Sequence, residues 1–384
     1  AQEMQHRIAK IVPCSGGMWI HTFHAFGARM LRQHGRLINI KQDFVIYDED
    51  DQKKLIQLSL EELGLESEKT KAGLYVSIIS RAKDDLLDAG SYLINAEASG
   101  EPNRLKAAQI YQRYQKKLNE AGALDFGDLI LRTAELLKEK DDIREYFQEH
   151  FQYVLVDEYQ DTNHAQYVLV KTLSAKNRNL CVVGDPDQSV YGWRGADIRN
   201  ILEFEKDFKD AKTIVLEQNY RSTSRILQAS NEVIKHNKGR KPKDLWTEKP
   251  EGEAVELLEF STEGDEAKGI MEKVKWLTAR AGFGYNDIAV FYRTNAQSRQ
   301  FEEAFSAASL PFKVVGSVRF YERKEIKDAL AYARAALNPS DSVSLDRALN
   351  VPTRGVGKAA DDALKLFAAE RELTLRQAVA QAAQ

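Results

Sequence analysis

The sequence lacks the features that mark secreted, fibrous and membrane proteins. Only two of its 384 residues are cysteine, too few for disulfide bonds to stabilise a chain of this length. Eight prolines and 22 glycines exclude collagen-like and low-complexity classes. No apolar run reaches the roughly 18 residues that a membrane-spanning helix needs. Residues 1–10 carry charges instead of the apolar segment of a signal peptide. We therefore expect a cytoplasmic protein with no membrane partner.

An excess of either charge is also absent. The 55 basic and 58 acidic residues leave a net charge of −3, which by itself gives no indication of a nucleic-acid partner. The balance differs locally, because residues 218–250 hold eight basic and three acidic side chains. Such a distribution allows a basic face on a nearly neutral protein, although solvated helix faces are the simpler explanation.

The pattern of apolar residues predicts two kinds of structure along the chain. At about 150 residues per domain, the length predicts two or three domains. Residues 48–120 have the spacing of helices, and Asp48 is the expected N-cap of the first. From residue 151 onward, short apolar runs alternate with helical patterns, which favours a parallel sheet covered on both faces. The expected strands are residues 153–156, 180–183 and 213–216.

A second α/β unit follows. Residues 253–260 and 288–292 are expected strands, and residues 266–279 between them are an expected helix. A third, mostly helical part begins near Ile326.

The most informative segment is an apolar run that ends in two carboxylates, Asp157 and Glu158. In open α/β sheets, ligands bind at the carboxyl ends of strands. An aspartate there can hold Mg²⁺ on the phosphates of a nucleotide, and the next carboxylate can deprotonate an attacking water. An apolar strand followed by Asp-Glu also occurs without such a role, so the pair needs support from other segments.

The ends of the next two apolar runs supply that support. Gln188 follows one run and can hydrogen-bond a terminal phosphate. Tyr191, Trp193 and Arg194 come soon after it in a glycine-containing loop, and such side chains stack on bases. Trp193 could instead be a core residue. Arg221 follows the third run, where an arginine can clamp a phosphate or form a surface salt bridge.

Three segments in this order resemble motifs II, III and IV of superfamily 1 DNA helicases of the UvrD/PcrA/Rep type. They are VDEYQDTN (156–163), VVGDPDQSVYGWRGAD (182–197) and LEQNYRST (216–223). The likeness extends over the whole chain. It includes TFHAFGARMLR (22–32), LDFGDLI (124–130), VFYRTNAQSR (290–299), VGSVRFYERKEIKDALAY (315–332) and NVPTRGVG (350–357).

The resemblance implies an α/β fold with two RecA-like P-loop-NTPase motor domains. Each would have a parallel sheet and a helical insertion, and the chain would be incomplete at both ends. The first motor domain would comprise residues 1–47 and 119–217, with its helical insertion at 48–118. The second would comprise residues 218–330, and residues 331–384 would begin its insertion.

The resemblance also implies roles at a site for ATP and Mg²⁺. Asp157 would hold the metal, Glu158 would be the catalytic base and Gln188 would sense the γ-phosphate. Arg221 would contact the γ-phosphate as an arginine finger, and Tyr220 would stack on adenine. The residues implied to contact single-stranded DNA are Thr22, Phe23, His24, Phe126, Tyr191, Trp193, Arg194, Arg293 and Asn295. His24 could alternatively be a metal ligand, but no suitably spaced Cys/His cluster supports this.

The chain departs from the family in what it lacks. A P-loop has the pattern GxxxxGK[ST], and no segment matches it. The family's motif V and motif VI are also absent. We therefore expect that the chain as given cannot hydrolyse ATP efficiently. An internal slice of a longer helicase is one explanation, and a degenerate paralogue is the alternative.

The expected parent protein is an ATP-dependent 3′-to-5′ DNA helicase of DNA repair or replication. Its partners would be single-stranded DNA, duplex/single-strand junctions and repair or replication proteins. A non-catalytic single-strand-binding module is a second hypothesis. The motor subunit of a recombination helicase-nuclease is a third.

Overall fold

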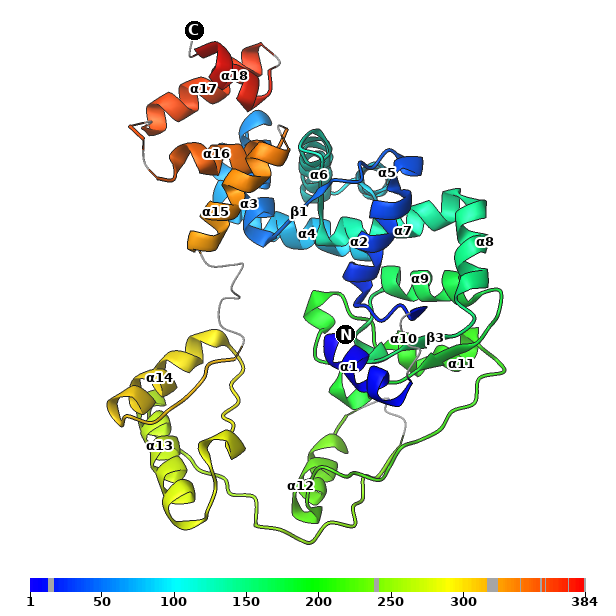
Figure 1. Ribbon diagram of the computed structural model, residues 1–384, viewed down its shortest axis with the longest axis vertical. Helices are drawn as coiled ribbons and strands as arrows, with labels where there is room; N and C mark the ends of the chain where they lie inside the picture. The colour runs from blue at the N-terminus through cyan, green and yellow to red at the C-terminus, as the bar shows by residue number, and fades with distance from the viewer. Residues whose placement is uncertain are drawn as a thin grey trace. The chain divides into compact units, whose positions relative to one another are not determined.

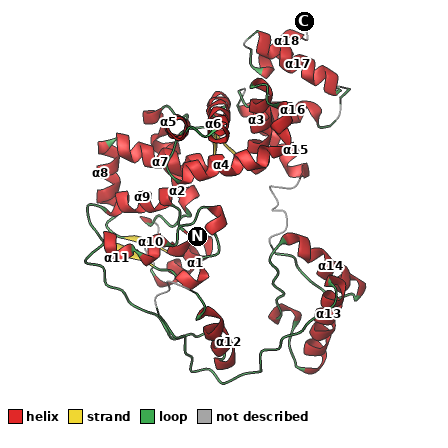
Figure 2. Ribbon diagram, turned by 180° about the vertical axis from the view of Figure 1, so that it is seen from behind, coloured by secondary structure: helices red, strands yellow, loops and turns green. Residues whose placement is uncertain are grey.

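Helices dominate the protein, and its strands are short and parallel, as expected for a mostly helical α/β chain (Figure 2). The computed structural model describes residues 1–12, 17–237, 242–315, 324–338, 340–352, 354–355, 357–371 and 373–382. Two compact units are present. Unit 1 comprises residues 1–215, 237–243 and 330–384, and unit 2 comprises residues 216–236 and 244–329.

Four helices that pack on one another form a hydrophobic core in unit 1 (Figure 1). They are α3 (Glu49–Glu62), α4 (Ala72–Asp84), α5 (Ala89–Ser99) and α6 (Pro102–Glu120). Asp48 caps α3 as the sequence predicts, because its carboxylate accepts from two N–H groups of the first turn at 3.0 Å. The chain enters and leaves this group through a parallel pair that the sequence did not predict, β1 (Val45–Tyr47) and β2 (Ala123–Asp125).

A second core of unit 1 lies among helices that precede and follow this group. The helices of this part are α1 (Gln2–Ile11), α2 (Phe23–His34), α7 (Phe126–Glu139), α8 (Asp141–His150) and α9 (His164–Ser174). A buried ion cluster joins α4 to the start of α7. The Lys83 Nζ lies 2.6 Å from Asp125 Oδ2 and 2.8 Å from Asp128 Oδ1. Because unpaired buried charges are costly, this cluster fixes the position of α7.

The strands β3 (Val154–Val156) and β4 (Leu180–Val182) pair in parallel, which confirms two predicted strands. The expected cover on both faces is wrong for the described residues. Val156 is buried against α9, whereas Leu155, on the other face, is 75% exposed. Residues 213–216 form no strand, since no backbone among the described residues pairs with them. The short helices after β4 are α10 (Arg199–Leu202) and α11 (Phe204–Asp207).

The C-terminal helices of unit 1 pack on the α3 region through polar contacts. These helices are α15 (Lys324–Leu337, from Leu330 onward), α16 (Ser342–Asn350), α17 (Lys358–Glu370) and α18 (Leu375–Ala382). The Tyr47 hydroxyl donates to Asp341 Oδ1 at 2.6 Å, and Lys54 pairs with Asp346. Residues 316–323, Thr353 and Val356, which belong to two of the resembling segments, lie outside the described residues.

Unit 2 contains α12 (Ser224–Ile234), α13 (Glu263–Arg280) and α14 (Ser298–Ala307), and α13 confirms the helix expected at 266–279. The strands expected at 253–260 and 288–292 are not formed in the described residues. Leu257 and Phe291 in these segments are 91% and 92% exposed. A strand needs a partner for its backbone hydrogen bonds, and here none of the described residues provides one.

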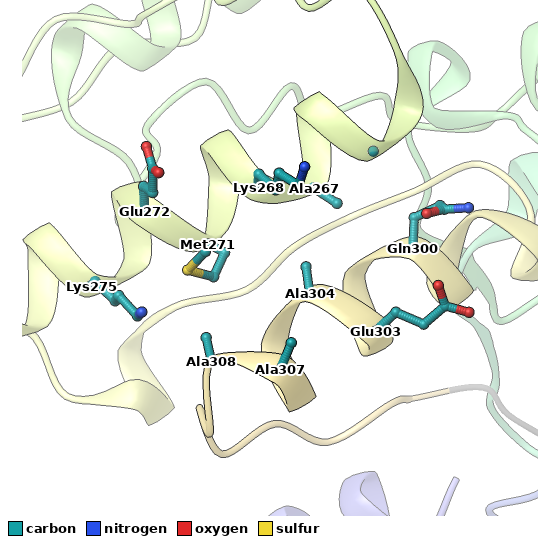
Figure 3. A pocket seen from close by; sticks show the side chains of 11 residues that line it. Ala267, Lys268, Met271, Glu272, Lys275, Gln300, Glu303, Ala304, Ala307 and Ala308 are labelled. Atoms are coloured by element: carbon teal, nitrogen blue, oxygen red, sulfur yellow. The ribbon is translucent and has the colours of Figure 1, made fainter.

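A groove of about 500 Å³ lies between α13 and α14 of unit 2 (Figure 3). Small and apolar side chains line much of it, including Ala267, Met271, Ala304 and Ala307. None of the predicted site residues lines this groove. The candidate functional site must therefore be built elsewhere.

Candidate functional site

Asp157 and Glu158 follow β3 directly, as the sequence predicts, and both side chains are exposed. The Glu158 backbone has φ 53° and ψ 42°, in the left-handed region that residues other than glycine rarely adopt. Its N–H donates to Asp157 Oδ1 at 3.0 Å. Such strain costs on the order of 1–3 kcal/mol and persists where the surroundings impose it, often at functional positions. The turn therefore fixes the position of the Glu158 carboxylate, and the strained backbone lowers the stability of the fold.

Gln160 connects this turn to the end of β4. It is 1% exposed, and its Nε2 donates to Glu158 Oε2 at 2.8 Å. Its Oε1 accepts from the Asp185 N–H at 3.0 Å. The Gln188 side chain, on the turn that follows β4, donates to Asp185 Oδ2 at 2.7 Å. The structure thus brings the three predicted nucleotide residues, Asp157, Glu158 and Gln188, to the carboxyl ends of two neighbouring strands.

The electrostatics of Asp185 support this arrangement. Burial alone would raise the pKa of Asp185, but hydrogen bonds from Lys243, Gln188 and the Asp187 N–H hold it below its ordinary value. Lys243 also lies 3.7 Å from Asp187. Asp185 is therefore a charged acceptor that holds the Gln188 amide in place.

The aromatic loop, defined as residues 189–195, follows Gln188. Trp193 is 65% exposed and Tyr191 is 43% exposed. The Arg194 guanidinium carbon lies 4.6 Å from the Trp193 ring centroid and 5.9 Å from that of Tyr191. The alternative that Trp193 is a core residue is wrong. Exposed aromatic faces beside a guanidinium can stack on nucleic-acid bases.

The far end of the aromatic loop is held by α4 and by the turn after β3. The Asp197 N–H donates to Thr162 O at 2.9 Å. Gly195 has φ 86°, and a Cβ there would lie 2.7 Å from Asp84 Oδ2. Asp84 in turn accepts from Asn163 Nδ2 at 2.6 Å. Asp84 therefore lies in a tight contact between the helical group and the aromatic loop.

A second group of predicted DNA-contacting residues meets at the start of α2 and α7. Phe126 is the first residue of α7, is 48% exposed and lies edge-on to His24 with ring centroids 5.6 Å apart. Burial lowers the pKa of His24, so its ring is neutral near pH 7. The Thr22 hydroxyl caps α2 by accepting from Ala25 N at 3.3 Å. Phe23 packs partly buried against the core, which gives it a structural role.

The remaining predicted residues lie in unit 2 and are exposed. The Tyr220 hydroxyl donates to Gln218 Oε1 at 2.7 Å, and the Arg221 N–H donates to Asn219 Oδ1 at 2.9 Å. The Arg221 guanidinium makes no hydrogen bond or ion pair within the described part of the chain. The Arg293 N–H donates to Gln297 Oε1 at 3.0 Å, and Asn295 begins the next turn.

Asp157 is suited to hold Mg²⁺ as one ligand among several. Its Oδ1 accepts from the Glu158 N–H, and its Oδ2 has no hydrogen-bond donor among the described residues. Magnesium in nucleotide sites takes one or two carboxylates, with phosphates and water completing its shell. Consistent with that, no cluster of three or more His, Cys, Asp or Glu side chains in the described ranges could hold a metal by itself.

Comparisons with known proteins identify the family of the chain. The family described as "UvrD/REP helicase N-terminal domain" matches residues 1–209, and "UvrD-like helicase C-terminal domain" matches residues 214–384. The chain belongs to the UvrD/Rep helicase family. The first match of this family contains the Asp157, Glu158 and Gln188 group and the aromatic loop. The second contains Tyr220, Arg221, Arg293 and Asn295.

Curated UvrD/Rep relatives resemble the chain along its whole length. The ATP-dependent DNA helicase PcrA of Staphylococcus aureus (strain Mu50 / ATCC 700699) is 45% identical over 383 residues, which cover 100% of this chain and 52% of the relative. The ATP-dependent DNA helicase PcrA of Staphylococcus epidermidis (strain ATCC 12228 / FDA PCI 1200) is 44% identical over 385 residues, which cover 99% and 52%. The chain thus spans about half the length of the curated relatives it matches. In its described residues, no helix is both long and apolar enough to cross a membrane.

Sequence reasoning missed the residues that support the UvrD/Rep site. Gln160, Asp185 and Asp84 are ordinary polar residues in the sequence, and only their burial and contacts distinguish them. Gln160 and Asp185 lie inside the resembling segments, which was a usable signal. Asp84 lies far from them in sequence, and nothing indicated its place beside Gly195.

Asp84 makes the stability of unit 1 depend on pH. Burial, with the nearby Asp85 and Asp125 carboxylates, raises the pKa of Asp84 from 3.8 to about 7. Between these values the folded protein binds a proton that the unfolded chain has released, so stability falls as pH rises through this window. The slope is at most about 1.4 kcal/mol per pH unit. We expect Asp84→Asn to flatten the dependence, measured by urea unfolding from pH 4.5 to 8. The exposed control Asp142→Asn should retain it, and an unchanged slope in Asp84→Asn would contradict this account.

Glu158 provides a test of backbone strain. Glu158→Gly and Glu158→Ala both remove the carboxylate, but only glycine adopts the left-handed conformation without cost. We expect the glycine variant to be more stable than the alanine variant by about 1 kcal/mol in chemical denaturation. The same pair at Glu145, in the regular helix α8, should show the opposite order by about 1 kcal/mol. Equal stabilities of the two Glu158 variants would mean that the turn is unstrained.

Proposed function

We propose that a full-length protein carrying this chain is an ATP-dependent DNA helicase that moves 3′ to 5′ along single-stranded DNA in DNA repair or replication. The observation that carries the proposal is the shared turn after β3. It bears the Asp157 and Glu158 carboxylates and is bonded to the loop that bears Gln188 and the exposed aromatic side chains. The printed names of the relatives, which call them ATP-dependent DNA helicases, support the same activity.

The proposed chemistry assigns one task to each carboxylate. Asp157 would hold Mg²⁺, which when bound neutralises phosphate charge and orients the terminal phosphate. The Glu158 carboxylate would accept a proton from water as its oxygen attacks the γ-phosphorus and the bond to the β-phosphate oxygen breaks. Gln188 would donate a hydrogen bond to the γ-phosphate. Arg221 and Tyr220 keep the roles that the resemblance implies, contact with the γ-phosphate and stacking on adenine.

The proposed DNA path follows exposed rings and short polar side chains. Tyr191, Trp193 and Phe126 would stack on successive bases, and Arg194 would add a cation beside them. Thr22, Phe23, His24, Arg293 and Asn295 would contribute further strand contacts. Stacking is tolerant of sequence, because every base has a π-face. The partners would be single-stranded DNA, duplex/single-strand junctions and other repair or replication proteins.

A single-strand-binding module without catalysis is the competing function, because the exposed aromatic loop could bind DNA without ATP. Hydrolysis distinguishes the two functions. On the helicase proposal, single-stranded DNA stimulates ATP hydrolysis by the full-length protein, and Glu158→Gln lowers the rate at least about a hundredfold, to a residual rate that single-turnover assays still measure. Duplexes with a 3′ single-stranded tail should be unwound, and those with a 5′ tail should not. DNA binding without stimulated hydrolysis would favour the binding module instead.

Trp193 tests the DNA path in the same protein. We expect Trp193→Ala to weaken binding to an oligothymidylate by about 1–3 kcal/mol, since one stacking platform is lost. Binding should also weaken as salt increases. The matched control is Trp276→Ala, another half-exposed tryptophan, located on α13. Fluorescence anisotropy at two salt concentrations measures both effects, and equal affinities of the two variants would contradict the proposed path.

A further inference from the structure

We propose that Gln160 is a positioning residue that links the Glu158 carboxylate to the aromatic loop, so that hydrolysis responds to bound DNA. The inference rests on the proposed function, and it starts from one contact. Within the described residues, Gln160 is the sole side chain that donates a hydrogen bond to the Glu158 carboxylate, at 2.8 Å. The exposed carboxylate of Glu158 has no other such restraint.

Each polar atom of the Gln160 amide has a hydrogen-bond partner that only that atom can satisfy. The Nε2 group can only donate and the Oε1 atom can only accept. Nε2 faces a carboxylate oxygen of Glu158, and Oε1 faces the N–H of Asp185. Rotating the amide by 180° would place like groups against each other at both ends. Because Gln160 is 1% exposed, water could not compensate for that loss. The amide therefore has one orientation in which both neighbours are satisfied.

The space around Gln160 leaves little freedom for its partners. A Cβ at Gly184 would lie 2.4 Å from Gln160 Oε1, so the end of β4 is in close contact with the amide. The Ser189 hydroxyl donates to Gln160 O at 3.4 Å. The segment that leads into Tyr191 is thus bonded to the turn that carries Glu158 at two points, the Asp185 N–H and the Ser189 hydroxyl.

Through these contacts, a movement of the aromatic loop can displace the Glu158 carboxylate. Bases that stack on Tyr191 and Trp193 act on a loop whose start is bonded to Gln160. A shift of the Asp185 N–H must move the Gln160 amide or leave a buried group without its partner. The same amide sets the position of the Glu158 carboxylate, where the proton of the attacking water is accepted. DNA bound to the aromatic loop therefore changes the alignment of the Glu158 carboxylate, the proposed general base, without contacting the nucleotide.

The substitution Gln160→Glu removes the hydrogen bond to Glu158 and keeps the hydrogen bond from the Asp185 N–H. A glutamate oxygen still accepts from Asp185 N–H, but nothing donates to Glu158, and a second negative charge lies beside it. In the full-length protein we expect the DNA-stimulated kcat to fall at least about tenfold, with the KM for ATP and the DNA affinity within about twofold of wild type.

The matched control is Gln148→Glu. Gln148 also donates through Nε2 to a fixed acceptor, Thr172 O at 2.7 Å, but it joins α8 to α9 away from the site. It should leave kcat and its stimulation by DNA unchanged. A purely structural role for Gln160 would lower the melting temperature and the active fraction, and it would leave the kcat per active molecule unchanged.

A double-mutant cycle keeps the proposal testable if Gln160→Glu folds poorly. Gln160→Met has similar length and introduces no charge. If Gln160 acts through Glu158, Gln160→Met should lower the single-turnover rate in the wild-type background and have no further effect in the Glu158→Gln background. Equal losses in both backgrounds would overturn the proposal, as would a wild-type kcat in Gln160→Glu. Absence of DNA-stimulated hydrolysis in the wild-type protein would instead contradict the proposed function.

Discussion

Two parallel strands of unit 1 end side by side, and the buried amide of Gln160 lies across their ends. This amide must satisfy a carboxylate on one side and a backbone N–H on the other, because no water reaches it. The requirement fixes the turn after β3 relative to the turn after β4. The Glu158 backbone in this turn lies in the left-handed region. The positions of the candidate nucleotide residues and of the aromatic loop both depend on this constraint.

The helical group of unit 1 supports the same region from the side. Lys83 and Asp84 are adjacent on α4, and they contact different parts of the site, the start of α7 and the end of the aromatic loop. Lys83 joins the buried carboxylates at the start of α7 and so fixes Phe126. Asp84 accepts from Asn163 and lies against Gly195 at the end of the aromatic loop. A helix outside the sequence motifs therefore positions aromatic side chains from two separate segments of the proposed DNA path.

The sequence predicted the parts of the structure that depend on local pattern. The strands before Asp157 and Gly184, the capped helix after Asp48 and the family followed from apolar spacing and from motifs. Strands that need distant partners could not be predicted reliably. Residues 253–260 and 288–292 have strand patterns but no partner among the described residues, whereas β1 and β2 pair although the sequence did not indicate them. Supporting residues such as Asp84 were missed because their importance arises from burial and contact in three dimensions. The domain limits and the roles of the individual site residues stay predictions.

Amide hydrogen exchange tests most directly whether the turn after β3 and the aromatic loop behave as one unit. The N–H groups of Asp185 and Asp197 are bonded to Gln160 and Thr162 respectively. If the account is right, both amides are protected in the wild-type protein, and addition of an oligothymidylate changes their exchange rates together. Fast, unprotected exchange at Asp185 and Asp197 would contradict it. So would a DNA response confined to residues 191–194.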